Sequence, residues 1–168
     1  MKQLLALALP VFALDQATKW WIVRHIAWSA EWPPVDPAAH IAILPGTFHL
    51  VYWANTGAAF SVGHGRNGFF IILSLLALIG IVIATLRGAF HDRLSRIGVG
   101  VLVGGILGNV TDRIIHAHVV DFLLVDLGVR FADPWPAFNV ADSAIFIAVA
   151  LFILASFLAP PASSSAQD

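Results

Sequence analysis

Apolar residues gather into four long runs along this chain, with polar or proline-rich segments between them. These runs lie near residues 4–26, 68–87, 97–115 and 139–159. A helix that crosses a bilayer needs about 20 mostly apolar residues, and each run approaches that length. The pattern therefore predicts a mainly α-helical membrane protein with four transmembrane helices, folded as a single domain over residues 1–168.

The segment between the first two runs has a different pattern. Prolines break residues 27–67, and His40–Leu44 and residues 47–53 resemble short strands separated by Pro45-Gly46. We therefore expect a small β-sheet, or cradle, with a short loop helix on one face of the membrane. The final segment, 160–168, is small and polar, which predicts disorder.

Composition supports a bilayer environment. Hydrophobic residues make up 59% of the chain and charged residues 11%, whereas soluble domains have about 45–50% apolar and about 25% charged residues. The net charge of −1 gives no reason to expect nucleic acid as a partner. The absence of cysteine excludes disulfides, thiol catalysis and zinc–thiolate sites.

Basic residues predict the orientation of the chain. Lys2 and the arginines at 87, 93 and 96 favour the cytoplasmic side. Both termini would then be cytoplasmic, and segments 27–67 and 114–138 would lie outside. Six tryptophans and the one tyrosine fall on that outer side, where amphipathic rings favour the interface. The first run could also be a cleaved signal peptide, but its polar residues and paired tryptophans favour a retained helix.

Ionisable residues within the runs converge on one depth. Because a helix rises about 1.5 Å per residue, Asp15 and Asp112 each lie roughly 21–22 Å from the inner end of their helices. Asp142 starts the fourth run at its outer end, and Asp121 lies just outside the membrane. Charged groups in a bilayer are costly and usually pair or function. We therefore expect a polar site near the outer leaflet, with Asp15 and Lys19 as an ion pair.

Local spacing adds detail to this site. Asn109, Asp112 and Arg113 have the i, i+3, i+4 spacing of one helical face, and Asn139 and Asp142 are also three residues apart. Glycines at 100, 104 and 108 predict close packing with another helix. The turn-like Asn55-Thr56-Gly57 could place backbone and amide groups beside a peptide, although Asn55 and Asn109 could instead satisfy backbone groups.

Carboxylates offer the clearest chemistry. No serine stands with a clear histidine base, and His116 and His118 alone are a weak metal signal, so we predict neither a metal nor a cofactor. Two close aspartates cannot easily both ionise. Such a pair shares a proton and can act as base and acid on a water and a peptide carbonyl.

Five motifs, in order along nearly the whole chain, resemble those of lipoprotein signal peptidase, also called signal peptidase II. They are Leu14-Asp15-Gln16-Ala17-Thr18-Lys19, Asn55-Thr56-Gly57-Ala58-Ala59-Phe60, Gly104-Gly105-Ile106-Leu107-Gly108-Asn109-Val110-Thr111-Asp112-Arg113, Val119-Val120-Asp121-Phe122 and Phe138-Asn139-Val140-Ala141-Asp142-Ser143.

The resemblance implies an aspartic endopeptidase of the bacterial inner membrane, surrounded by membrane lipids. It would cut diacylglyceryl-modified prolipoproteins just before the lipidated cysteine, with Asp121 and Asp142 as its two catalytic residues. The residues that would line or support the site are Asn55, Gly57, Asn109, Asp112, Arg113, Asn139, Asp15 and Lys19. We further expect a monomer that binds no nucleic acid.

Individual acids also allow other interpretations. Asp112 could replace Asp121 as the partner of Asp142, although the neighbouring Arg113 favours a permanently ionised Asp112. Asp142 could simply cap its helix. Asp126 and Asp133 match no motif and are expected to be solvated loop charges.

Three other protein classes fit the sequence less well than a signal peptidase. A small transporter would show inverted repeats or helices broken at mid-membrane, whereas here the acids lie at one face and no repeat appears. A presenilin-like peptidase would need Tyr-Asp and Gly-x-Gly-Asp motifs, which are absent. A dimerising protein could use the glycine stripe, but packing within the four-helix bundle explains the stripe more simply.

Overall fold

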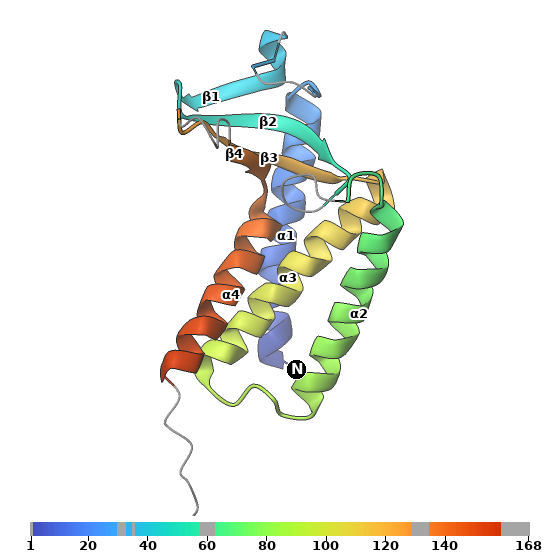
Figure 1. Cartoon of the computed structure of the whole chain (residues 1–168), viewed down its shortest axis with the longest axis vertical. Coiled ribbons are helices and arrows are strands. Elements are labelled where there is room, and N and C mark those ends of the chain that lie inside the picture. Colours follow the sequence, from blue (N-terminus) through green and yellow to red (C-terminus); the bar gives the residue numbers. More distant parts are fainter. Residues whose placement is uncertain (1, 30–32, 35, 58–62, 129–134, 159–168) are drawn as a thin grey trace, which may run out of the picture.

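The computed structural model describes residues 2–29, 33–34, 36–57, 63–128 and 135–158. Four long helices and a small sheet make up this part of the chain. The elements are α1 (Lys2–His25), a 3-10 helix (Pro37–Ala39), β1 (His40–Leu44), β2 (Phe48–Asn55), α2 (Asn67–Leu86), α3 (Arg93–His116), β3 (Val119–Val125), β4 (Trp135–Phe138) and α4 (Val140–Leu158). Figure 1 shows the sheet across one end of the helices, opposite the start of α1 and the end of α4.

Among the described residues, three helices are long and apolar enough to cross a membrane: α2, α3 and α4. Helix α1 has 24 residues but contains the buried charges Asp15 and Lys19, and its crossing stays a prediction. The predicted disordered tail, 160–168, lies outside the described residues.

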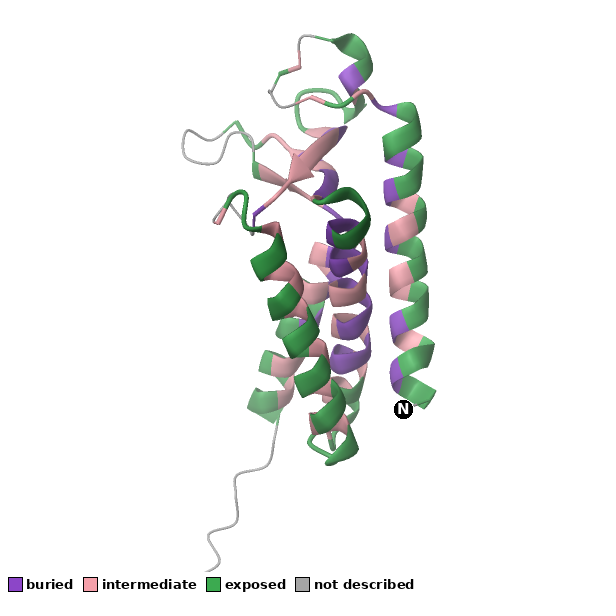
Figure 2. Ribbon diagram, turned by 90° about the vertical axis from the view of Figure 1, so that its right-hand side faces the viewer, coloured by how far each residue is buried: buried purple, intermediate pink, exposed green. Residues whose placement is uncertain are grey.

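Helix α3 lies between α1 and α4, and glycines bring the three helices together. A Cβ built on Gly104 would lie 2.7 Å from the carbonyl oxygen of Ala8 on α1, and one on the adjacent Gly105 would lie 2.7 Å from that of Ala141 on α4. The predicted close packing of the glycine stripe is therefore confirmed, with α1 as the partner of Gly104. Figure 2 shows buried residues concentrated on α3 and along one side of α1.

The sheet has the antiparallel order β1-β2-β3-β4. Strand β1 has its predicted bounds, whereas β2 extends through Asn55, and β3 and β4 were not predicted as strands. Side chains alternate between the faces of a strand. Val120 and Phe122 of β3 pack against Ile22 of α1 and Ile26 just after it, and Asp121 points into the cavity described below.

Candidate active site

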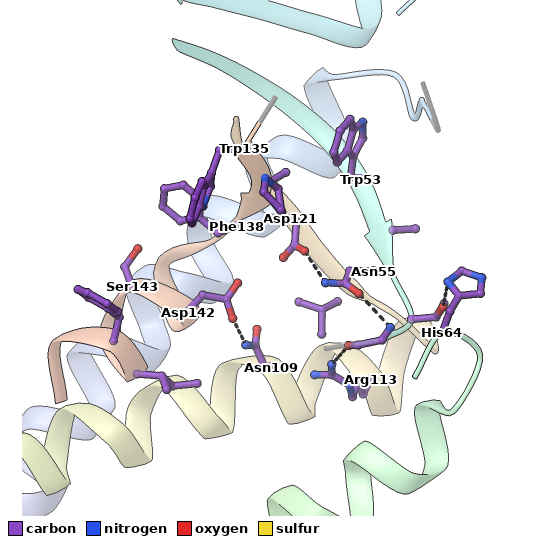
Figure 3. A pocket seen from close by; sticks show the side chains of 18 of the residues that line it. Trp53, Asn55, His64, Asn109, Arg113, Asp121, Trp135, Phe138, Asp142 and Ser143 are labelled. Atoms are coloured by element: carbon purple, nitrogen blue, oxygen red, sulfur yellow. Dashed lines mark hydrogen bonds between the residues drawn. The ribbon is translucent and has the colours of Figure 1, made fainter. Parts of the chain in front are cut away.

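A cavity of about 1120 Å³ opens where the sheet meets the C-terminal end of α3 and the N-terminal end of α4. Its polar lining includes Asn55, Asn109, Arg113, Asp121 and Asp142. These side chains come from β2, α3, β3 and α4, so sequence segments far apart converge on one space. In Figure 3 the carboxylates of Asp121 and Asp142 both point into it.

Asp121 is held by two asparagine amides. Asn55 Nδ2 donates to its Oδ2 at 2.8 Å, and Asn139 Nδ2 donates to its Oδ1 at 2.7 Å. The residue is only 3% exposed. Burial, followed by the charge of Asp142, raises the pKa of Asp121 to about 7, against the lowering effect of the asparagine hydrogen bonds.

Asp142 lies in the first turn of α4 and takes part in the helix cap. Asn139 Oδ1 accepts the backbone N–H of Asp142 at 2.9 Å, while Asp142 Oδ2 accepts the backbone N–H of Asn139 at 3.2 Å. This is a reciprocal capping arrangement. Asn139, directly before the helix, is therefore the N-cap, which corrects the interpretation of Asp142 as the cap residue. The other oxygen of Asp142 accepts from Asn109 Nδ2 at 2.7 Å.

A buried charged layer lies behind the two carboxylates. Lys19 Nζ is 2.9 Å from Asp15 and 2.9 Å from Asp112, so the predicted Asp15–Lys19 ion pair is present and extends to a second acid. Asp15 accepts the backbone N–H of Ala141 at 2.8 Å, and Asp112 accepts that of Val120 at 3.0 Å. The two acids thus fix the backbone immediately before Asp142 and Asp121.

Two residues expected to line the site do not line the cavity. Asp112 is 2% exposed and binds Lys19 of α1, because its position on α3 faces that helix. Asn139 is fully buried between its hydrogen-bond partners. Both residues support the wall of the cavity from behind, and neither presents an open side chain to a ligand.

Arg113 joins α3 to the turn after β2. Its Nη2 atom donates to the carbonyl oxygen of Gly57 at 2.6 Å, and its guanidinium lies 5.2 Å from the centroid of the Phe70 ring. Gly57 N–H in turn donates to Asn55 Oδ1 at 2.9 Å. These contacts fix the Asn55 amide so that its nitrogen faces Asp121.

Most of the remaining cavity lining is apolar and aromatic. Its wall includes Trp28, Trp53, Trp135, Phe138, Ile145, Phe146 and Val149. Phe146 of α4 is 76% exposed, so this wall continues onto the outward surface of a helix able to cross a membrane. A ligand with a long apolar segment fits such a site better than a small polar one.

The histidine pair noted in the sequence lies outside this cavity lining. The rings of His116 and His118 are 5.9 Å apart, and His118 Nε2 lies 3.4 Å from the hydroxyl of Tyr52. Burial, followed by the charge of His116, lowers the pKa of His118. Within the described ranges no third histidine or acid joins them in a metal-binding group.

Proteins of one known family match most of this chain. The family model of signal peptidase (SPase) II matches residues 7–158. A lipoprotein signal peptidase from a Nostoc species is 41% identical over 155 residues, covering 90% of this chain and 87% of the relative. The corresponding protein of Halalkalibacterium halodurans is 35% identical, covering 88% and 86% of the two chains.

A solved structure extends the likeness to the fold. A bacterial membrane enzyme determined by the in meso method at 2.3 Å resolution aligns with a TM-score of 0.81 and 25% identity, over 100% of this chain and 95% of that one. The sequence motifs, the fold and the matched length agree, and the chain belongs to the signal peptidase II family.

Proposed function

We propose that this protein is an aspartic endopeptidase that removes signal peptides from diacylglyceryl-modified prolipoproteins, cutting just before the lipidated cysteine. The observation that carries the proposal is the pair of carboxylates, Asp121 and Asp142, held by asparagine amides at the wall of one cavity. Relatives named lipoprotein signal peptidase support the substrate class.

In this proposal the two carboxylates share one proton around a water molecule. The ionised carboxylate takes a proton from the water as the water oxygen attacks the peptide carbonyl carbon, and the protonated carboxyl donates its proton to the carbonyl oxygen. The C–N bond then breaks. The leaving amine receives the proton taken from the water, and the other carboxylate recovers its proton from the diol. A pKa of about 7 for Asp121 supports a shared proton near neutral pH.

The apolar wall of the cavity supports a lipid-linked substrate. Phe138 of β4 and Phe146 of α4 both line it, and acyl chains lying beside α4 would remain in the bilayer. We propose a bacterial inner-membrane location with cytoplasmic termini and the cavity at the outer face. No cofactor enters the proposed reaction, and we propose that a single chain carries it out.

Cleavage of a diacylglyceryl-modified prolipoprotein by the purified protein tests the proposal. The unlipidated substrate is tested in parallel, with Asp121→Asn, Asp142→Asn and the control Asp126→Asn. Asp126 follows β3 and does not line the cavity. We expect cleavage of the lipidated substrate alone, by the wild type and Asp126→Asn.

Each aspartate variant of the pair should be inactive yet folded. Turnover by folded Asp142→Asn would contradict the mechanism. Failure of the wild type to cut either substrate would contradict the proposed function itself.

A further inference from the structure

The buried side of the carboxylate pair contains a cation that the proposed reaction does not use. Lys19 on α1 is 3% exposed. Besides its two ion pairs, its Nζ atom donates to Asn109 Oδ1 at 2.9 Å. An ammonium group has three donors and no acceptor. The amide oxygen of Asn109, and never its NH2 group, must therefore face Lys19.

This contact determines what Asn109 presents to the catalytic pair. With its oxygen toward Lys19, the amide directs Nδ2 to Asp142 Oδ1 at 2.7 Å. The same oxygen also accepts from Asn139 Nδ2 at 3.2 Å, and that nitrogen donates to Asp121. Each carboxylate of the pair therefore accepts a hydrogen bond from an asparagine amide nitrogen.

We propose that Lys19 is a positioning residue of the peptidase reaction: its ammonium fixes the orientation of the Asn109 amide and thereby keeps Asp142 as the ionised member of the pair. The inference rests on the proposed function. A reversed Asn109 amide would turn its oxygen toward Asp142, and only a protonated carboxyl can donate to that oxygen. Loss of Lys19 would therefore favour a protonated Asp142, which cannot take a proton from water.

Four charged residues face the pair from the helices packed against it. They are Asp15 and Lys19 of α1 and Asp112 and Arg113 of α3. Within the described residues, Lys19 is the one cation among them that donates to an asparagine contacting Asp142. Arg113 instead donates to the Gly57 carbonyl.

The test compares the wild type with the double variant Lys19→Met/Asp112→Asn, and Asp112→Asn alone is the control for the loss of Asp112. The double variant loses one cation and one carboxylate together, so the buried cluster keeps the net charge of the wild type. We expect the acidic limb of its kcat/KM profile to lie at higher pH than in the wild type. At pH 6 the loss of kcat/KM should be about tenfold, within the range of coupling between residues in contact, with most of it in kcat.

Asn109→Leu provides a second test with Lys19 in place. The substitution removes the amide donor to Asp142 Oδ1 without adding a charge. We expect the acidic limb to move in the same direction. Gln16→Met is the control, because Gln16 donates to Asp15 and Asp112 and has no hydrogen bond to Asn109 among the described contacts, and it should keep the wild-type profile.

An unchanged acidic limb in Asn109→Leu, or equal profiles for the wild type and the double variant, would overturn the inference. Failure of the proposed function would give a different result. The wild type would not cleave the substrate, or folded Asp142→Asn would cleave it.

Discussion

At the scale of single residues, the buried carboxyl of Asp121 links the proposed chemistry to folding. It is 3% exposed and has a pKa of about 7, against 3.8 for an ordinary aspartate. Between these two values the folded protein binds more protons at this position than the unfolded chain. The contribution of this group to stability therefore falls as pH rises through the window, and it is constant above it.

Asp121→Asn removes this titration while keeping the shape of the side chain. We expect the melting temperature of the variant, relative to wild type, to rise from pH 5 to pH 8, because only the wild type must bury a developing charge. Intrinsic fluorescence of the six tryptophans in detergent can follow unfolding. If the difference in melting temperature between Asp121→Asn and the wild type does not change with pH, the raised pKa of Asp121 is contradicted.

Residue spacing predicted the polar site but not the direction of each side chain. Asn109, Asp112 and Arg113 share a broad helical face, yet adjacent positions 112 and 113 differ by about 100° around the axis. This rotation is enough to send Asp112 toward Lys19 and Arg113 toward Gly57. Spacing within one helix could not show which neighbour each side chain would meet, since that depends on α1 and the sheet.

At the scale of elements, close helix contacts fix the depth at which the polar layers meet. Gly104 allows α3 to approach Ala8 and Val11 of α1, which places Lys19 within reach of Asn109. Packed backbones at this distance leave no room for a side chain. The alignment of the charged layer therefore depends on a glycine one to two turns away.

Gly104→Ala should separate α1 from α3 and destabilise the protein by about 1–3 kcal/mol, the usual effect of overpacking. Gly80→Ala on α2 is the matched control, because a Cβ there meets nothing within 4 Å, and alanine is the better helix former. We expect the melting temperature to fall for the first variant and not for the second. Equal melting temperatures would contradict the close packing.

The strands were predicted less completely than the helices. Long apolar runs predicted each helix to within a few residues, although α3 begins earlier than expected, at Arg93. Residues 119–125 form a short apolar run after a helix, and such a run does not distinguish a strand from a buried helical segment. Its conformation is decided by pairing with β2, where Asn55 and Asp121 are 66 residues apart in the chain.

At the scale of the whole molecule, the sheet lies across one end of the helices and the cavity lies where they meet. Thr47 lies in the turn between β1 and β2, and His91 lies between α2 and α3 at the opposite end (Figure 1). Lys2 begins α1 near the His91 end. If α1 crosses the bilayer, Lys2 and His91 share one side and Thr47 lies on the other.

Single cysteines test this arrangement without interference, since the chain has none of its own. We expect Thr47→Cys to react with an impermeant maleimide in cells whose inner membrane is intact, and Lys2→Cys and His91→Cys only after that membrane is opened. Labelling of Lys2→Cys together with Thr47→Cys would show that α1 does not cross.

The apolar wall that continues from the cavity onto α4 has a consequence for kinetics. Ligands that reach the site along exposed Phe146 arrive by lateral diffusion in the bilayer or micelle. Their encounter rate with the site then depends on their mole fraction in the lipid or detergent phase and not on their bulk concentration in water. Added detergent would dilute substrate and inhibitor alike, so that apparent potency falls as the surface available to them grows.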